Sequence, residues 1–166
     1  MNLKYAFTFL IILFFQVLFS QQMPIDFSDG TDNFNVFSGS GYAFSSNPDD
    51  SNDDVGQFFN DGTSPWQGFY IDLNVPINLD EQQQITLSFY QFDPNTHNIY
   101  VKLENGTNPD VEVMQNTSGT GWSNDIVFDF SNATITGTSN TVNATGSYTR
   151  LVILIDGGAN SPGTYL

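Results

Sequence analysis

The chain contains a single histidine, His97, and catalysis by an activated nucleophile usually needs an imidazole as general base. His97 follows the turn Asp93-Pro94-Asn95, and none of the glycine patterns of a nucleophile elbow is present. The chain has no cysteine, so a zinc site would need three carboxylates, which zinc seldom accepts. No glycine-rich phosphate loop leads from a strand into a helix. These observations argue against a hydrolytic triad, a zinc enzyme and a phosphate-loop enzyme.

Acidic residues supply the remaining catalytic option, because a glycosidase needs only two suitably placed carboxyl groups. The three glutamates are Glu81, Glu104 and Glu112, and none of them lies in a recognisable acid–base context. We therefore expect that this chain is not an enzyme.

Aspartates gather in two stretches whose oxygen atoms suit Ca²⁺. Neither stretch has the spacing of an EF-hand loop with its closing glutamate. Two interpretations stand: ordinary solvated turns, or a structural Ca²⁺ site whose ligands are unknown. The residues concerned are Asp26, Asp29 and Asp32, followed by Asp49, Asp50, Asp53 and Asp54.

Alternation along three predicted strands directs a different set of side chains toward solvent. In each strand, tyrosines and polar or charged residues separate the apolar positions that face the core. The outward residues, strand by strand, are Tyr70 and Asp72, then Ser88 and Tyr90, then Tyr100, Lys102 and Glu104. The three tyrosines share one face of the domain if the three strands belong to one sheet.

A row of exposed tyrosines beside polar side chains has the chemistry of a sugar-binding site. The C–H face of a pyranose stacks on a flat ring, while Asp, Glu and Lys side chains bind the hydroxyls. Tyrosine is also a good strand residue that is often half exposed, so a structural role is the alternative.

Two further residues extend this hypothesis, and a third, Trp122, does not. Trp66 follows a Ser64-Pro65 turn at the start of a strand, where an indole can lie at the rim of a binding face. His97 can hydrogen-bond a ligand, although a solvated histidine in a turn is the simpler interpretation. Trp122 is interpreted as a structural residue over the edge of the core. The predicted ligand-binding set is Trp66, Tyr70, Asp72, Tyr90, His97, Tyr100, Lys102 and Glu104.

Short alternating apolar runs, separated by Gly, Asn, Asp, Pro and Ser, predict an all-β fold of two antiparallel sheets packed as a β-sandwich of the jelly-roll type. The first two runs are interpreted as a strand pair or one bent strand, and the fourth as a strand ended by Pro76. Residues 131–147 are expected to form a long loop with at most one weak strand, and residues 151–155 a central strand covered on both faces. The expected strands span residues 34–37, 41–44, 55–59, 66–73, 85–90, 99–104, 111–113, 126–130 and 151–155.

The first residues have the layout of a cleavable secretory signal peptide over residues 1–21, followed by one domain over residues 22–166. Lys4 supplies the positive charge, and Ser20 supplies a small residue after the apolar run. An uncleaved anchor helix is the alternative, but the run is shorter than the roughly 20 residues that a membrane span needs. We therefore expect a secreted protein, extracellular or on the cell surface, with no membrane insertion after cleavage.

The charge balance excludes several partners. All 18 acidic residues follow Ser20, against only Lys102 and Arg150, so the mature net charge is 2 − 18 = −16. Such a surface repels phosphate groups, so neither nucleic acid nor anionic lipid is an expected partner.

Several runs in the second half of the chain resemble carbohydrate-binding-type jelly-roll modules of the galactose-binding-like sandwich class. The runs are IYVKLENG at 99–106, VEVMQ at 111–115, GW at 121–122, IVFDFS at 126–131 and LVILIDG at 151–157. Such modules accompany secreted bacterial polysaccharide-degrading enzymes, so the resemblance implies linked domains. It also implies a further strand after the Gly-Thr-Tyr segment that helps to hold a structural Ca²⁺. We accordingly expect the sandwich to be truncated at its last strand.

These observations together predict a non-catalytic module that binds a polysaccharide or oligosaccharide and tethers a linked enzyme or surface protein to it. The alternative is a structural or adhesive extracellular sandwich without a sugar site.

Overall fold

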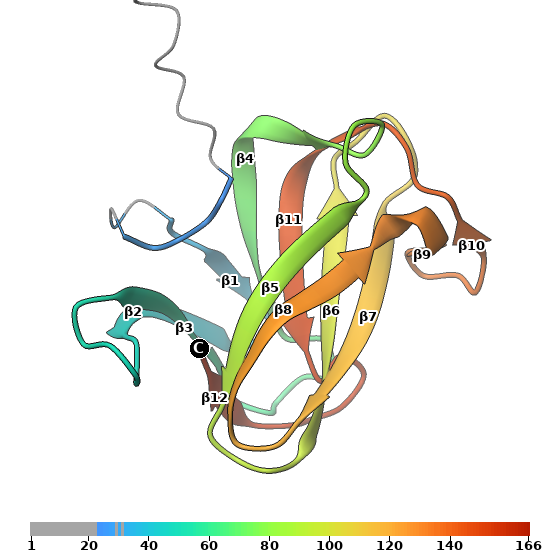
Figure 1. Ribbon diagram of the computed structural model, residues 1–166. Helices are drawn as coiled ribbons and strands as arrows, with labels where there is room; N and C mark the ends of the chain where they lie inside the picture. The colour runs from blue at the N-terminus through green and yellow to red at the C-terminus, as the bar shows by residue number, and fades with distance from the viewer. Residues whose placement is uncertain (1–22, 29, 31) are drawn as a thin grey trace, which may run out of the picture.

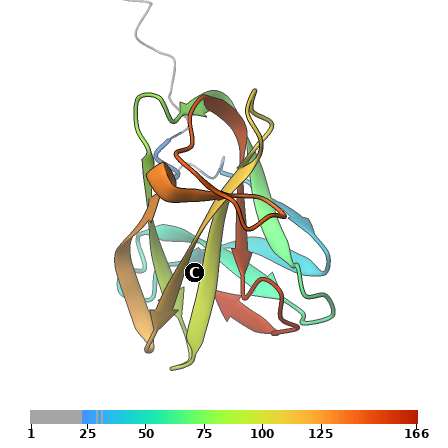
Figure 2. The ribbon, with the colours of Figure 1, turned by 90° about the vertical axis from the view of Figure 1, so that its right-hand side faces the viewer.

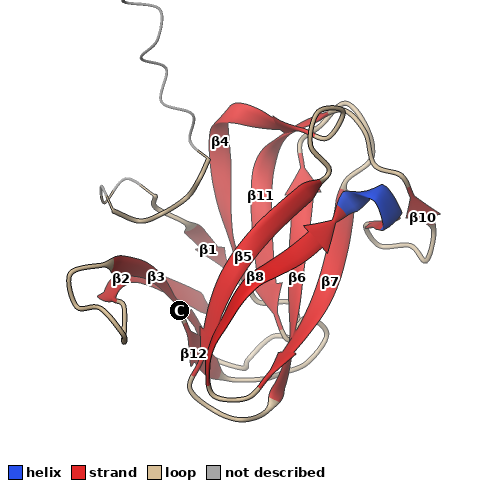
Figure 3. Ribbon diagram, viewed as in Figure 1, coloured by secondary structure: helices blue, strands red, loops and turns tan. Residues whose placement is uncertain are grey.

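The computed structural model describes residues 23–28, 30 and 32–166, so the predicted signal peptide lies outside the described part of the chain. The described chain forms two antiparallel sheets that pack as a β-sandwich (Figures 1 and 3). The predicted all-β sandwich is therefore confirmed. Within these residues, no helix has both the length and the apolar character needed to cross a membrane.

The larger sheet has seven strands in the order β1-β4-β11-β6-β7-β9-β10. Its centre is formed by β4, β11 and β6, which come from distant parts of the sequence. The strands are β1 (Asn35–Phe37), β4 (Gly68–Asn78), β11 (Ser147–Ile155), β6 (Thr96–Glu104), β7 (Val111–Ser118), β9 (Ala133–Ile135) and β10 (Thr141–Val142).

The smaller sheet has five strands in the order β2-β3-β12-β5-β8. They are β2 (Ser40–Ser46), β3 (Asp54–Asn60), β12 (Gly163–Tyr165), β5 (Gln84–Gln91) and β8 (Gly121–Asp129). The C-terminus, at the end of β12, lies part-way along the strands rather than at an end of the sandwich in both views (Figures 1 and 2).

The core lies between the two sheets and is built from the alternate, inward-facing residues of each strand. Phe69 of β4, Ile99 and Leu103 of β6, and Phe128 of β8 are completely buried. Each such side chain contributes about 1.5–3 kcal/mol through removal of apolar surface from water. Because the chain has no cysteine, no disulfide adds to the stability that this burial provides.

Strand β11 confirms the predicted central strand, since all five residues of its second half are buried between β4 and β6. The prediction that Pro76 ends the fourth strand was wrong. Strand β4 continues through Pro76 to Asn78, and its pairing with β11 is interrupted between Asp72 and Ile77. This position tolerates a proline, because the strand makes no ladder hydrogen bond here that would need the N–H group proline lacks.

Two other local predictions differ from the structure. The two opening runs are not paired with each other, because β1 joins the seven-stranded sheet and β2 the five-stranded sheet. Ser38 and Gly39 make the crossing with positive φ angles of 57° and 89°. The expected loop over residues 131–147 contains two short strands, β9 and β10, after a 3₁₀ turn at Phe130–Asn132.

Candidate functional site

The outer face of the seven-stranded sheet collects most of the predicted ligand-binding residues. Paired residues on neighbouring strands point to the same face of a sheet. On β11, Arg150 lies opposite Asp72 of β4 on one side and Glu104 of β6 on the other. In the same way, Val152 lies between Tyr70 and Lys102, and Leu154 lies between Gly68 and Tyr100. The register therefore brings Tyr70, Asp72, Tyr100, Lys102 and Glu104 together, as predicted from the alternation.

Arg150 contacts both Asp72 and Tyr70 on this face. Its Nε donates to Oδ1 of Asp72 at 2.7 Å, and its Nη2 donates to Oδ2 at 3.2 Å. These hydrogen bonds lower the pKa of Asp72 and raise that of Arg150. The guanidinium carbon also lies 4.2 Å from the ring centroid of Tyr70. Arg150 thus covers one face of the Tyr70 ring, which leaves Tyr70 less open for stacking than the sequence suggested.

Lys102 and Glu104 continue this polar surface on β6. They form an ion pair with each other, and Oε2 of Glu104 also lies 3.9 Å from Nη1 of Arg150. We call Asp72, Arg150, Glu104 and Lys102 the charged row. Lys102 and Arg150 are the only lysine and arginine in residues 23–166, so both basic side chains of this acidic domain lie on one face.

The loop between β3 and β4 holds Trp66 at the surface. The neighbouring Gln67 is only 2% exposed and anchors the loop, because its amide accepts from Gly62 N and donates to Ser38 O, both at 2.8 Å. Trp66 itself stays 52% exposed. The indole is therefore fixed by its neighbours without being part of the core.

Trp66 and Tyr100 form an aromatic corner beside the charged row. Their ring centroids are 6.3 Å apart, and the ring planes meet at 71°. The indole packs against Gly157, where an added Cβ would lie 2.8 Å from Cζ3 of Trp66 and 3.2 Å from Cε2 of Tyr100. Gly158 N donates to Pro65 O at 2.6 Å and ties the two loops together. We call Trp66 and Tyr100 the aromatic corner.

Tyr90 does not join this face, so the condition that all three strands share one sheet is not met. Its strand, β5, belongs to the five-stranded sheet, on the opposite side of the sandwich. There Tyr90 packs against Trp122 and Phe92, with ring centroids 5.2 Å and 4.9 Å apart. Trp122, expected over the core edge, is a half-buried member of this second aromatic cluster.

The interpretation of His97 as a solvated turn residue was wrong. His97 lies on β6 with its side chain facing the interior, and it is only 5% exposed. Its Nδ1 lies 2.8 Å from Oδ2 of Asp156, and its Nε2 lies 3.2 Å from Oδ1 of Asp93. The hydroxyl of Tyr165 donates to the same Asp156 oxygen at 3.3 Å. His97 is therefore part of a buried polar network that joins β6 to Asp156, directly after β11, and to β12, away from the outer face.

The aspartates considered for Ca²⁺ mostly stabilise turns. Oδ2 of Asp32 accepts from the backbone N–H groups of Asp26 and Phe27 at 3.2 Å and 3.1 Å. In the second stretch, Oδ2 of Asp53 accepts from the amide of Asn47 at 2.8 Å. Asp29 lies outside the described residues, and among the described ones no three acidic or histidine side chains gather in a metal-binding group. The Ca²⁺ site stays a prediction.

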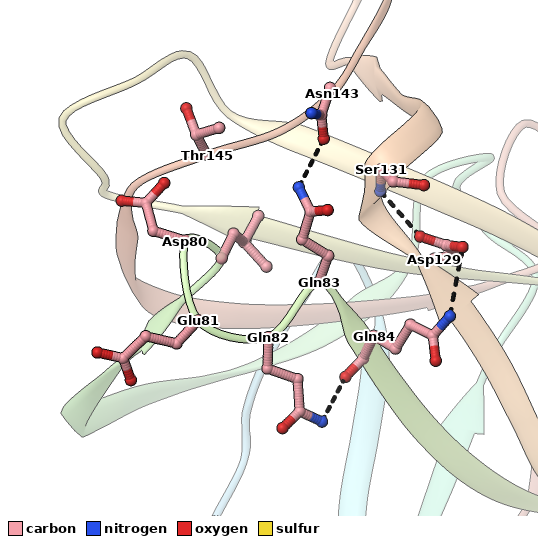
Figure 4. Close-up of a pocket in the computed structure, with 10 residues that line it drawn as sticks. Asp80, Glu81, Gln82, Gln83, Gln84, Asp129, Ser131, Asn143 and Thr145 are labelled. Atoms are coloured by element: carbon pink, nitrogen blue, oxygen red, sulfur yellow. Dashed lines mark hydrogen bonds between the residues drawn. The ribbon is translucent and has the colours of Figure 1, made fainter.

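A polar hollow of about 650 Å³ lies at one end of the sandwich (Figure 4). Its amides are already bonded to neighbours, for example Gln83 Nε2 to Asn143 Oδ1 at 2.6 Å and Gln84 Nε2 to Asp129 Oδ2 at 3.4 Å. No aromatic ring lines it, so a sugar ring would find hydrogen-bonding groups there but no stacking surface.

Comparison with known proteins supports the fold. No protein family and no curated protein matches the chain. Two solved structures are similar to it: an exo-β-agarase, with a TM-score of 0.56 and 8% identity, and a second agarase, with a TM-score of 0.55 and 9% identity. The matches cover 84% and 86% of this chain but only 23% of each agarase chain. At this identity the likeness shows the fold alone.

Proposed function

We propose that this chain is a secreted, non-catalytic carbohydrate-binding module that holds a larger protein on a polysaccharide. The observation that carries the proposal is the position of the aromatic corner on the same sheet face as the charged row. Trp66 and Tyr100 offer ring surface to the C–H face of a sugar, while Lys102, Glu104 and Asp72 offer donors and acceptors to its hydroxyls.

The size of the matched segment supports an accessory role. The chain corresponds to about a quarter of each agarase that it resembles, as expected for a module within a multidomain protein. A shallow face of this kind binds weakly by itself, but linkage to another domain raises the effective concentration of the ligand. Because the two neighbours are agarases, agarose is the first polysaccharide to test.

The test is affinity electrophoresis of residues 22–166 through polyacrylamide gels that contain soluble agarose, laminarin, xylan, alginate or pectin. Retardation by at least one glycan is expected. The double substitution Trp66→Ala with Tyr100→Ala removes the aromatic corner and should abolish it, since loss of a central aromatic contact costs about 1–3 kcal/mol or more.

The matched control is the double substitution Tyr90→Ala with Trp122→Ala, which removes two rings from the opposite sheet. It should leave the retardation unchanged. Loss of retardation in this control alone would move the site to the five-stranded sheet. Free migration of the unmodified domain in every gel would favour the structural or adhesive alternative.

A further inference from the structure

Both basic side chains after Ser20 lie on the proposed glycan-binding face. Lys102 and Arg150 are the only lysine and arginine in that part of the chain, against 18 acidic residues. The single histidine, His97, faces the interior of the sandwich and is only 5% exposed. A sulfate or carboxylate group of a ligand could therefore pair with a side-chain cation only at Lys102 or Arg150.

Arg150 is already paired with carboxylates. It makes two hydrogen bonds to the two carboxylate oxygens of Asp72, and its Nη1 lies 3.9 Å from Oε2 of Glu104. Its guanidinium group also lies over the ring of Tyr70. A two-point pair of arginine and carboxylate is geometrically specific, so an anionic group of a ligand would have to displace Asp72 to gain the same contacts.

Lys102 is enclosed by carboxylates in the same way. Its Nζ lies 2.5 Å from Oε1 of Glu104, and only 17% of its side chain is exposed. In the sheet register Lys102 also lies opposite Glu112 of β7, which places a third carboxylate on the same face. With Asp72, Glu104 and Glu112 against Lys102 and Arg150, the net charge of these groups is 2 − 3 = −1. Among the described residues, the face therefore holds no unpaired cation.

The face is longer than one sugar ring. Tyr100 and Glu104 are four residues apart on β6, so about 13 Å separates the aromatic corner from the Arg150 end of the charged row. Strands β4, β11 and β6 lie side by side, and the face follows their direction (Figure 1). A ligand that stacks on Trp66 and also reaches Asp72 is therefore an oligosaccharide segment that runs along the strands.

An uncharged sugar and an anionic sugar would meet this face differently. Hydroxyl groups both donate and accept, so they can bind the paired carboxylates and N–H groups without separating them. An anionic substituent would have to break an ion pair, or stay unpaired near a chain whose net charge after Ser20 is 2 − 18 = −16. We propose that the face binds a segment of an uncharged polysaccharide and discriminates against the sulfated form of the same polysaccharide. This inference rests on the proposed function and specifies the class of its ligand.

The test compares glycans that differ only in charge. Agarose, laminarin and xylan are each compared with the same glycan after chemical sulfation, in affinity gels that contain EDTA so that no divalent cation bridges protein and sulfate. The affinity for the uncharged member of the binding pair should exceed that for its sulfated form by about tenfold or more. This difference should narrow as added salt shortens the Debye length from about 30 Å at 0.01 M to about 10 Å at 0.1 M, because the sulfate groups are repelled.

The double substitution Asp72→Asn with Glu104→Gln tests the origin of the discrimination. It keeps the shape and an oxygen acceptor at both positions but releases Arg150 and Lys102 from their partners. The affinity for the sulfated glycan, relative to the uncharged one, should rise by about tenfold.

The matched control is Asp49→Asn with Asp50→Asn, which changes the net charge by the same amount in an exposed loop after β2. Its affinity ratio should stay within about twofold of the unmodified domain, because the ion pairs of the charged row remain.

Equal or stronger retardation by a sulfated member in EDTA would overturn this inference and leave the proposed binding function intact. An unchanged affinity ratio in the Asp72→Asn, Glu104→Gln variant would also overturn it. Free migration of the unmodified domain through all six glycans would instead count against the proposed function, and the inference would fall with it.

Discussion

The buried network around His97 provides the most quantitative prediction, through the substitution His97→Ala. His97 and Asp156 are 5% and 7% exposed, and their side chains approach to 2.8 Å. Removing the imidazole leaves the Asp156 carboxylate in the interior with two remaining donors, Asn98 N at 3.1 Å and the Tyr165 hydroxyl at 3.3 Å.

The expected loss follows from these contacts. Removing a buried hydrogen bond to a carboxylate costs about 1.5–3 kcal/mol, and the cavity left by the imidazole favours the upper end, about 3 kcal/mol. In a domain of this size each kcal/mol shifts the melting temperature by about 2–4 °C, so a decrease of about 6–12 °C is expected. Thermal unfolding at neutral pH, followed by circular dichroism or calorimetry, measures it directly.

Asp93→Asn is the matched control, because it changes the other carboxylate that His97 contacts, at 3.2 Å. The Asp93 side chain is 44% exposed, so this substitution should cost less than about 1 kcal/mol. A melting temperature for His97→Ala within about 2 °C of the unmodified protein would refute the reasoning. Equal losses in the two variants would also contradict it.

Three further predictions concern other parts of the sandwich. Arg150→Met keeps the apolar stem but removes the hydrogen bonds that lower the pKa of Asp72, so that pKa should rise toward its ordinary value in an NMR titration. Gly157→Ala places a Cβ 2.8 Å from Cζ3 of Trp66, so it should displace the indole. The glycan affinity measured by gel retardation should fall by about tenfold, while the melting temperature changes little. Burial, and secondarily the charge of Asp32, raises the pKa of Tyr42 from an ordinary 10.0 to about 12. The stability that the neutral Tyr42 hydroxyl contributes is therefore present below pH 10.0 and is lost as the pH rises toward 12. Denaturant unfolding of Tyr42→Phe should show a smaller decline over that range, and an unchanged decline would contradict this.

Alternation of apolar residues predicted several of the strands and outward-facing residues discussed above. It located β5 and β6, and it directed Tyr70, Tyr100 and Lys102 outward, because a half-buried strand must alternate to bury one side. A continuously apolar run, and not alternation, located β11. Arg150 was not predicted as part of the face. Its position between Asp72 and Glu104 depends on the β4-β11-β6 order, which no local pattern contains.

Sheet membership is the property that the sequence could not supply. Tyr90 fits the alternating pattern of its strand as well as Tyr70 fits that of its own. Alternation shows only that a residue faces outward, and it does not show to which of the two sheets the strand belongs. For the same reason His97 was misread. Its partner Asp156 lies 59 positions away, and only the pairing of β6 with β11 brings the two together.

The most direct test of the proposed glycan-binding face uses the only two tryptophans in the chain, Trp66 and Trp122. Trp66 belongs to the aromatic corner beside the seven-stranded sheet, and Trp122 lies on β8 of the five-stranded sheet. The two indole N–H signals can be followed by NMR while an agarose oligosaccharide, or whichever glycan retards the domain, is added to saturation. The account predicts that the Trp66 signal moves and the Trp122 signal does not. Movement of the Trp122 signal alone, or of neither signal at saturation, would contradict it.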